Sequence, residues 1–367
     1  MFLTLKKVLR YFYIYSIMRV IAKVLGRLRY NFKFWIILKF PFYNFSGRKL
    51  GFIGCGHHAF SSLAYFVYRY TTSDIRYIYD IDKLAATSFA NAYCLKSHRV
   101  DSLDSIELVY ISTNHASHVQ YALKCLKKNI DVFIEKPICT SLLQLEQLND
   151  AVSFSKSRIF TGFNRPFAPA IQFIKHTCAR TNNPISLSCS VIGHFLPPNH
   201  WYRDAAEGTR VLSNISHWID LSIHFLFNCK TSLPETITIN FSYSDFTCPT
   251  DNTSITLVSS DGDLFTIFFT SRSEPFEGVS ETILFQQDDV IAKIDDFRKM
   301  QLWKGHKKFI RRYWPKNNGH RECVLQPFAN SNSYRKWDEI KISAFITLKI
   351  DAMAKSCKTT SIIDLRN

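Results

Sequence analysis

The sequence predicts an α/β protein with an N-terminal, doubly wound parallel sheet and a C-terminal α/β domain built on a large, mostly antiparallel open sheet. Between residues 50 and 135, short apolar runs alternate with helix-length segments, which is typical of βαβ units. Beyond about residue 165, longer runs alternate polar and apolar positions, as half-exposed antiparallel strands do. The 367 residues exceed what one core usually organises, so two domains are expected.

The elements follow from these patterns in chain order. Strands are expected at 50–53, 75–80, 107–112 and 131–135, and helices at 59–70, 83–93 and 116–128. The later strands are expected in "ISLSCSVIGHF", "ETITINFSYSDF", "TSITLVSS", "DLFTIFFTS" and "SETILFQQ". We therefore expect a basic leader over 1–47, a parallel-sheet domain over 48–165 and a second α/β domain over 166–367.

The stretch "GCGHHA" follows the first expected strand and opens onto the first expected helix. Gly54, Gly56 and Ala59 stand in the order G-x-G-x-x-A, which indicates a turn that binds the phosphates of a dinucleotide. Gly54 permits the tight turn, Gly56 lets the backbone approach the pyrophosphate, and Ala59 allows close helix packing. The amides at the start of the helix would hold the phosphates.

An acidic residue, Asp80, ends the second strand and is placed to accept the ribose hydroxyls of NAD. Its neighbour Ile81 offers no cation for a 2′-phosphate, so NAD is favoured over NADP. The other interpretation of Asp80 is a turn or N-cap residue before the next helix, a role that Asp82 fits better.

Lys136 follows the strand "DVFIE" directly, within "EKP". A parallel strand delivers its C-terminal residues to the cofactor crevice, where a lysine can take part in proton transfer from a substrate hydroxyl. From the spacing alone, a surface lysine in an X-Pro turn is the other interpretation.

A series of motifs extends this pattern along the chain: "GCGHHA", "YISTNHASH", "FIEKP", "TGFNRPFAP", "PPNHWYRDAAEGTRVLSNISHWIDL" and "DDFRKMQLWKGHKK". The series resembles the Gfo/Idh/MocA family of nicotinamide-dependent oxidoreductases, from Lys49 to the end of the chain. The resemblance implies a Rossmann domain and a substrate-binding domain whose open sheet often forms the oligomer interface. It also implies a dehydrogenase acting on CH–OH groups of sugars, nucleotide sugars or cyclitols, with an unusual peptide geometry before Pro137.

The same resemblance assigns roles to individual residues. The family's lysine and catalytic histidine correspond to Lys136 and His217, with Asn214 nearby. The expected cofactor-binding residues are Gly54, Gly56, His57, His58, Ala59, Asp80, Asn114, His118, Glu135 and Lys136. The expected substrate-binding residues are Asn164, Arg165, Trp201, Arg210 and Asn214. Trp201 has two interpretations, stacking on a sugar or plain packing.

Departures from the family pattern lie close to the expected chemistry. Relatives commonly have G-G-G-R before the catalytic helix and an acid three or four residues before the histidine, whereas this chain has "EGTR" and then Ser213 and Asn214. Arg165 is followed by Pro166 where a second arginine is usual. An asparagine can hydrogen-bond a hydroxyl but cannot raise the basicity of an imidazole as a carboxylate would. Two hypotheses stay open: a sugar or nucleotide-sugar oxidoreductase, in one version serving surface-polysaccharide biosynthesis, and a catalytically impaired, cofactor-binding scaffold at a membrane in a glycan-assembly complex.

The formal net charge of +16 is concentrated in two blocks. Residues 1–49 carry eleven lysines and arginines and no acid, and residues 298–321 are basic without an acid. In the leader, apolar positions 17, 21, 24 and 28 share one helical face, with Arg19, Lys23 and Arg27 on another. This pattern predicts either a helix in an anionic membrane interface or one docked on its own protein or a second subunit. No uninterrupted stretch is long enough for a spanning helix.

The second block has three interpretations: a solvated loop, a grip on a phosphate-rich substrate, or a further membrane contact. No nucleic-acid motif accompanies it, so no nucleic-acid partner is expected. We expect a cytoplasmic homo-oligomer, and the membrane interpretation of the leader would make it peripherally membrane-associated.

Metal chemistry is not expected. The ten cysteines form no CxxC pair and read as reduced, mostly buried thiols. His217, Asp220 and His224 share helical spacing, but no HExxH motif supports a metal site.

Overall fold

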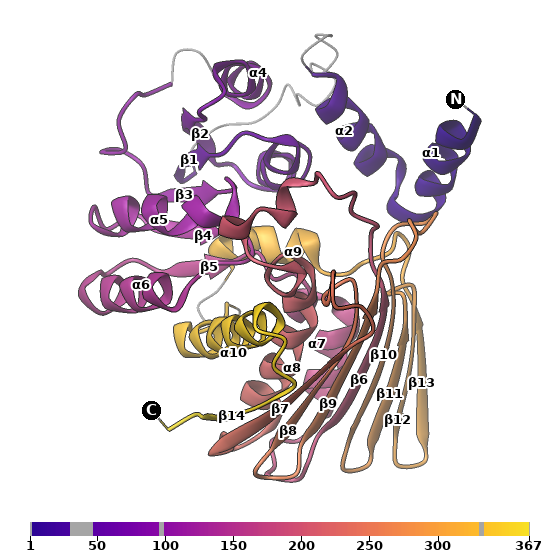
Figure 1. The fold of residues 1–367 in the computed structure, drawn as a ribbon. Coiled ribbons are helices and arrows are strands. Elements are labelled where there is room, and N and C mark those ends of the chain that lie inside the picture. Colours follow the sequence, from indigo (N-terminus) through magenta and orange to yellow (C-terminus); the bar gives the residue numbers. More distant parts are fainter. Residues whose placement is uncertain (1, 30–46, 95–98, 330–333, 367) are drawn as a thin grey trace. The chain divides into compact units, whose positions relative to one another are not determined.

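A computed structural model describes residues 2–29, 47–94, 99–329 and 334–366 (Figure 1). The part of the expected leader from 30 to 46 lies outside these residues. The chain divides into two compact units. The parallel-sheet unit comprises Ser16–Gly162 and Arg321–Arg335, and the open-sheet unit comprises Met1–Tyr15, Phe163–His320 and Lys336–Asn367.

The parallel-sheet unit holds five parallel strands in the order β2-β1-β3-β4-β5. The strands are β1 (Lys49–Ile53), β2 (Asp74–Tyr79), β3 (Leu108–Ile111), β4 (Asp131–Ile134) and β5 (Ile159–Thr161). The helices are α2 (Ile17–Leu28), α3 (Tyr65–Tyr70), α4 (Lys83–Tyr93), α5 (His118–Leu126) and α6 (Leu142–Phe154). A π-helical turn, Ala59–Ala64, precedes α3. The four expected strands are confirmed, and β5 is an additional one.

The open-sheet unit is built on nine strands in the order β13-β12-β11-β10-β6-β9-β8-β7-β14, and the pairing of β6 with β9 is its parallel one. The strands are β6 (Ser186–Ile192), β7 (Thr236–Tyr243), β8 (Asn252–Ser259), β9 (Leu264–Thr270), β10 (Ser280–Gln287), β11 (Val290–Asp295), β12 (Lys299–Lys304), β13 (Lys307–Arg312) and β14 (Thr360–Asp364). Its main helices are α1 (Phe2–Tyr15), α7 (Pro169–Thr177), α8 (Ser216–Cys229) and α10 (Trp337–Lys355). The expected α/β fold with a large, mostly antiparallel open sheet is confirmed.

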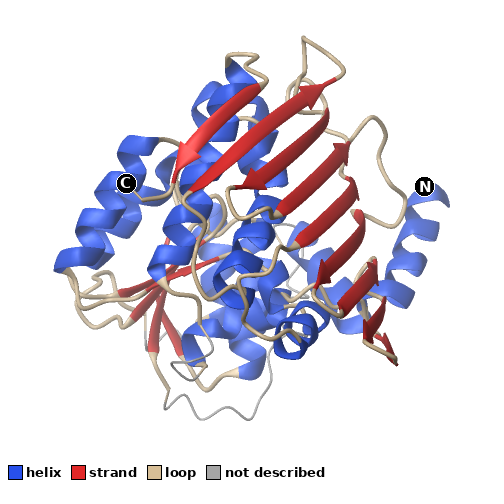
Figure 2. Cartoon of the chain, turned by 90° about the horizontal axis from the view of Figure 1, so that it is seen from below, coloured by secondary structure: helices blue, strands red, loops and turns tan. Residues whose placement is uncertain are grey.

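One core fills the open-sheet unit. Helices α7, α8 and α10 pack on one face of the sheet (Figure 2), and the inward side chains of the strands form the core with them. Alternate residues of the strands point to the other face, which follows from the two-residue period of a strand. The five strands read from the alternating pattern are β6 to β10, and their bounds agree closely with the expected runs.

The boundaries along the chain differ from the expected ones. Residues 321–335, which include most of α9 (His320–Leu325), belong to the parallel-sheet unit. The Tyr110 hydroxyl donates to the carbonyl of Val324 (2.7 Å), and the Gln326 amide donates to that of Thr161 (2.9 Å). These contacts join segments more than 160 residues apart, so no local pattern could show them.

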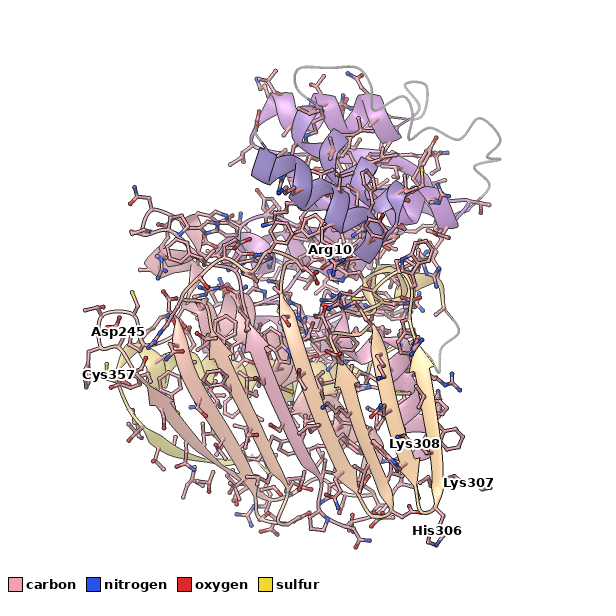
Figure 3. All side chains as sticks on the ribbon, turned by 90° about the vertical axis from the view of Figure 1, so that its right-hand side faces the viewer. Arg10, Asp245, His306, Lys307, Lys308 and Cys357 are labelled. Carbon is pink, nitrogen blue, oxygen red and sulfur yellow. The ribbon has the colours of Figure 1, made fainter. Side chains whose placement is uncertain are left out.

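The leader is likewise divided between the two units. Helix α1 joins the open-sheet unit, where Lys7 pairs with Glu274 (3.0 Å) and Arg10 pairs with Glu277 (Arg10 is labelled in Figure 3). The Trp314 indole donates to the carbonyl of Tyr13 (2.8 Å). Helix α2 packs on the parallel-sheet unit. Helices α1 and α2 therefore dock on the protein itself, which is one of the two interpretations of the leader.

The basic block at 298–321 is largely a hairpin, not a loop. Strands β12 and β13 pair antiparallel, and β13 lies at the edge of the sheet with all six residues exposed. Figure 3 shows His306, Lys307 and Lys308 at the tip of this hairpin. Lysine and arginine on an edge strand discourage pairing with another chain, which supports the solvated interpretation.

Two further expectations concern thiols and membrane spans. All ten cysteines are free thiols and most are buried, as expected. No helix in the described ranges has both the length and the apolar character needed to cross a membrane.

Candidate functional site

The glycine turn after β1 has the geometry that a phosphate-binding turn needs. Gly54 has a φ of +86°, and a Cβ on it would lie 2.3 Å from the carbonyl oxygen of Ser112. Only glycine fits there, because the conformation and the space both exclude a side chain. Gly56 is exposed, and a Cβ on it would meet nothing within 4 Å. The backbone is thus open to an approaching pyrophosphate, and the turn fits a dinucleotide.

Asp80 lies at the carboxyl end of β2, beside this turn. Its carboxylate accepts hydrogen bonds from the amides of Cys55 (2.6 Å) and Asp82 (2.8 Å). Asp82 caps α4 by accepting from the amide of Leu84 (2.8 Å), so the cap role belongs to Asp82. Asp80 supports the turn, and its contact with a ribose stays a prediction.

A pocket of about 390 Å³ opens next to Asp80. Its walls include Tyr79, Asp80, Lys83 and Arg99. Ile81 itself offers no cation for a 2′-phosphate, but Lys83 and Arg99 bring two cations to the pocket from other positions. Discrimination against a 2′-phosphate would depend on the negative charge of Asp80.

The two histidines of the turn are exposed, and Ala59 is fully buried against the unit's core. His58 Nε2 lies 3.1 Å from a carboxylate oxygen of Glu135. Burial alone would raise the pKa of Glu135, but His58 and Lys136 outweigh it and hold that pKa below its usual value. Glu135 is thus an anion that ties the glycine turn to the end of β4.

The "EKP" turn follows β4 and contains a cis peptide bond between Lys136 and Pro137. Lys136 is half-exposed, and its backbone amide donates to Glu135 (3.2 Å). A Cβ at Gly162 would lie 2.5 Å from the Glu135 carboxylate, so the glycine makes room for that anion. The unusual peptide geometry expected before Pro137 is present.

His118 and Asn114, both expected to bind the cofactor, have different surroundings. His118 is 1% exposed, with Nδ1 2.7 Å from the carbonyl oxygen of Pro137 and Nε2 3.2 Å from that of Thr113. One ring nitrogen thus faces the "EKP" turn and the other faces the loop after β3, and the cofactor contact of His118 stays a prediction. Asn114 is exposed, and its side chain accepts from Ser117 (2.5 Å).

In the open-sheet unit, Asn214 and His217 lie where a π-helical turn (Val211–Ile215) leads into α8. Both are half-buried, whereas the other residues from 211 to 221 are buried. The His217 ring packs edge-on against Phe163, with 5.7 Å between ring centroids. These two polar side chains are therefore the accessible ones on this stretch.

Arg210 is buried and holds Asn214 in place. Its Nε donates to the amide oxygen of Asn214 (3.2 Å), and its other nitrogens donate to Ser271 (2.6 Å) and to the carbonyl of His194 (2.6 Å). Burial lowers the pKa of Arg210, and nearby Asp251 (3.3 Å) opposes this shift. With its oxygen held by Arg210, Asn214 has its amide nitrogen as the donor for a hydroxyl. Arg210 is therefore a positioning residue in this arrangement.

The loop that carries Trp201 is tied to the same network. Arg203 donates to Asp251 (2.7 Å) and to the carbonyl of Leu196 (2.8 Å). Trp201 is 42% exposed and packs against Tyr202, with ring centroids 4.3 Å apart. Asp251 thus links the aromatic loop to Arg210, and the Trp201 ring has accessible surface.

Asn164 and Arg165 were expected to bind substrate, but both are buried. Arg165 makes a bidentate ion pair with Glu281 (2.8 and 3.1 Å), which also accepts from the indole of Trp218 (2.8 Å). The Asn164 amide donates to the carbonyl of Asn318 (2.6 Å). Both side chains thus hold the core of their unit together, and their contact with substrate stays a prediction.

His217, Asp220 and His224 share one helix, but the partners of Asp220 and His224 lie on another helix. Asp220 accepts from Ser343 (2.8 Å), and His224 lies 2.7 Å from Glu339. Both partners come from α10. Within the described part of the chain, no three metal-ligating side chains are grouped to hold an ion.

Sequence reasoning missed Glu281, Asp251 and Ser271, which lie on or beside strands of the open sheet. No motif marks them, since each acts on a residue at least 40 positions away. The structure also brings Lys83 and Arg99 to the pocket beside Asp80.

The parallel sheet, its open glycine turn and the residues at its carboxyl edge have the form of a dinucleotide-binding domain. Residues 48–163 match the profile of the Gfo/Idh/MocA family, described as an oxidoreductase family with an NAD-binding Rossmann fold. These residues are therefore similar to the NAD-binding part of this family, and the match agrees with the resemblance read from the motifs.

Known proteins extend the comparison. Glucose-6-phosphate 3-dehydrogenase of Bacillus subtilis (strain 168) is 26% identical over 187 residues, which cover 49% of this chain and 52% of that protein. The match thus spans about half the length of this curated relative. GenD2 from gentamicin A biosynthesis, solved with NAD, has a TM-score of 0.68 at 16% identity, covering 89% of this chain and 99% of that one. Levoglucosan dehydrogenase, solved with NADH, has a TM-score of 0.68 at 13% identity, covering 87% and 99%. At these identities, the structural matches show the fold.

Proposed function

We propose that the protein is an NAD-dependent oxidoreductase that transfers a hydride between nicotinamide and a carbinol carbon of a sugar or nucleotide sugar. The observation that carries the proposal is the gathering of the open glycine turn, Asp80 and Lys136 at the carboxyl edge of one parallel sheet. Ligands of open α/β sheets bind at that edge. The names of the similar proteins, which include dehydrogenases of sugars, support the substrate class.

Each side chain has a distinct proposed task. NAD, when bound, accepts the hydride. The Gly54–Gly56 turn binds its pyrophosphate through backbone amides, and Asp80 accepts its ribose hydroxyls. His217 exchanges the proton of the substrate hydroxyl as acid or base, and Lys136 hydrogen-bonds that hydroxyl. Asn214, held by Arg210, donates to a neighbouring hydroxyl, and the exposed ring of Trp201 can stack on the sugar.

A second candidate function is the membrane-associated scaffold, which binds the cofactor without turnover. The observation that favours it is Asn214, which stands where relatives have a carboxylate and therefore leaves His217 without that activation. A role in surface-polysaccharide assembly stays a prediction. So does the homo-oligomer, for which exposed apolar residues on the outer face of the sheet, such as Phe268 and Leu284 (46% and 48% exposed), offer a surface.

A substitution of Asp80 tests the proposed preference for NAD. We expect the protein to bind NADH more tightly than NADPH, and Asp80→Ala to lose most of this preference. Removing hydrogen bonds to a charged group costs about 1.5–3 kcal/mol, so the Kd for NADH should rise by about tenfold or more. The binding is measured by nicotinamide fluorescence and tryptophan quenching. Binding of neither dinucleotide by the unaltered protein would refute the proposal.

The membrane contact has a specific test in α2. Ile17, Val24 and Leu28 are exposed (61%, 36% and 42%), so the apolar stripe faces outward from the unit on which α2 docks. We expect the full chain to sediment with anionic vesicles, and replacement of these three residues by serine to reduce the bound fraction several-fold while thermal melting stays unchanged. Equal sedimentation of the two proteins would count against a membrane role for this stripe.

A further inference from the structure

Helix α2 lies directly on the segment that follows the glycine turn. A Cβ at Gly26 would be 3.0 Å from the Nδ1 of His57 and 3.2 Å from the Cβ of Ser61. The face of α2 that docks includes small residues, since Ala22 and Gly26 are buried. The absence of a side chain at Gly26 therefore lets the helix backbone approach the first residues after Gly56.

Two arginines fix this contact from either side of Gly26. The Arg19 guanidinium donates to the carbonyl of Ser61 (2.8 Å) and lies 4.3 Å from the ring centroid of Phe66. Arg29 is 4% exposed and lies 4.9 Å from the ring centroid of Phe60. The contact is thus polar and cation–π in character, and it joins the leader to the turn that would bind a pyrophosphate.

The docking brings basic residues to the N-terminal end of the helical segment that follows the glycine turn. The amides after Gly56 form the N-terminal end of a helical segment, where partial positive charge accumulates. Lys23 lies three residues before Gly26 and Arg27 one residue after it, and the first 49 residues contain no acid. The carboxylates of Glu135 and Asp80 also border the turn. A pyrophosphate on the backbone amides would add an anion within the electrostatic reach of Lys23 and Arg27.

Arg27 and Lys23 also affect the pKa of His57. Partial burial lowers its pKa most, and Arg27, His58 and Lys23 lower it further, although a hydrogen bond with the backbone of Gly26 opposes the shift. The contributions of Arg27 and Lys23 therefore place these two cations within electrostatic reach of the turn.

We propose that α2 is part of the dinucleotide site, with Gly26 seating the helix on the glycine turn and Lys23 and Arg27 attracting the pyrophosphate. The leader is then a component of cofactor binding, a role that the family's own motifs do not contain. This inference rests on the proposed function, because it requires the turn to bind a dinucleotide.

The experiment compares the full chain with two double variants of equal charge change. K23A/R27A removes the cations of α2, and K7A/R10A removes two cations of α1 that pair with Glu274 and Glu277 in the open-sheet unit. Calorimetry gives the Kd of each protein for NADH, for ADP-ribose, which keeps the pyrophosphate, and for adenosine, which lacks it. Thermal melting checks that the variants fold.

We expect K23A/R27A to raise the Kd for NADH and ADP-ribose by about fivefold to twentyfold at low salt, and by less at high salt because ions screen the attraction. Adenosine binding, and every Kd of K7A/R10A, should stay unchanged. Wild-type affinity for ADP-ribose in K23A/R27A would overturn the inference, as would an equal loss for adenosine. If the unaltered protein binds NADH but K23A/R27A is unaffected, only this inference fails. If the unaltered protein binds neither NADH nor ADP-ribose, the proposed function fails with it.

A second variant tests the seat of the helix. Gly26→Leu places a side chain against His57 and Ser61, where there is no room, and we expect it to weaken ADP-ribose binding in the same direction. A folded G26L protein with full affinity would contradict the part of the inference that concerns docking. Should G26L fail to fold, K23A/R27A still decides the matter.

Discussion

Replacing His217 with alanine is expected to lower kcat by about two to four orders of magnitude, the range that one general acid or base contributes, with little effect on the Kd for NADH. His217 is one of two accessible polar side chains on its stretch of helix, and cofactor binding is assigned to the other unit. The loss should therefore appear in turnover and not in dinucleotide affinity.

The measurement is NAD reduction with a panel of sugars. Glucose 6-phosphate and levoglucosan are chosen from the names of the similar proteins, and nucleotide sugars and a cyclitol are chosen from the family resemblance. His176→Ala, on an exposed position of α7, is the matched control and should turn over normally. If the wild-type protein binds NADH but turns over no substrate, the scaffold hypothesis gains. Unchanged turnover in His217→Ala would remove His217 from the mechanism.

Glu281→Gln is expected to destabilise the open-sheet unit strongly. The Glu281 and Arg165 side chains are 1% and 5% exposed, and their bidentate pair also receives the indole of Trp218. Neutralising Glu281 leaves the guanidinium buried without its counter-charge, and breaking such a pair costs about 3–5 kcal/mol. Chemical unfolding followed by tryptophan fluorescence measures the loss, since Trp218 lies in the pair.

The reciprocal test replaces both charges with apolar groups. Arg165→Met combined with Glu281→Leu should recover most of the stability, because apolar packing can substitute for a buried pair. Arg366→Ala, which removes an exposed pair with Asp364, is the control and should leave the unfolding curve in place. Equal stability of Glu281→Gln and the wild type would show that Arg165 finds another partner.

The parallel-sheet unit was well predicted because its signals are local. Gly54, Asp80 and Lys136 each follow a strand directly, and parallel strands bring their carboxyl ends to one edge without further information. The order of motifs therefore predicted the strands and the turn between them, and the cofactor roles of these residues stay predictions. The contacts of single residues were harder to predict. His118 and Arg165 belong to family motifs, yet a ring nitrogen of His118 contacts the carbonyl of Pro137 and the guanidinium of Arg165 pairs with Glu281.

The contacts of helix α2 in the leader could not be predicted from its sequence either. Its helical pattern correctly separated an apolar stripe from a basic one, but periodicity states only that two faces differ. The structure docks the side with Arg19 and Gly26 and leaves Ile17 and Leu28 exposed. Cation–π contacts and the close approach at Gly26 decide this, and neither has a signature in α2 alone.

The sequence by itself determined the fold class, the NAD-binding domain and the positions of Lys136 and His217, since these depend on residues that are neighbours along the chain. The tertiary structure alone decided that Arg210 orients Asn214, that residues 321–335 return to the parallel-sheet unit, and that α2 packs on the residues after the glycine turn. The reason is physical. Hydrogen-bond partners and packing surfaces depend on which residues lie close together in space. A glycine can pack against several different surfaces, and an arginine can bind several different partners, so the local sequence does not select one.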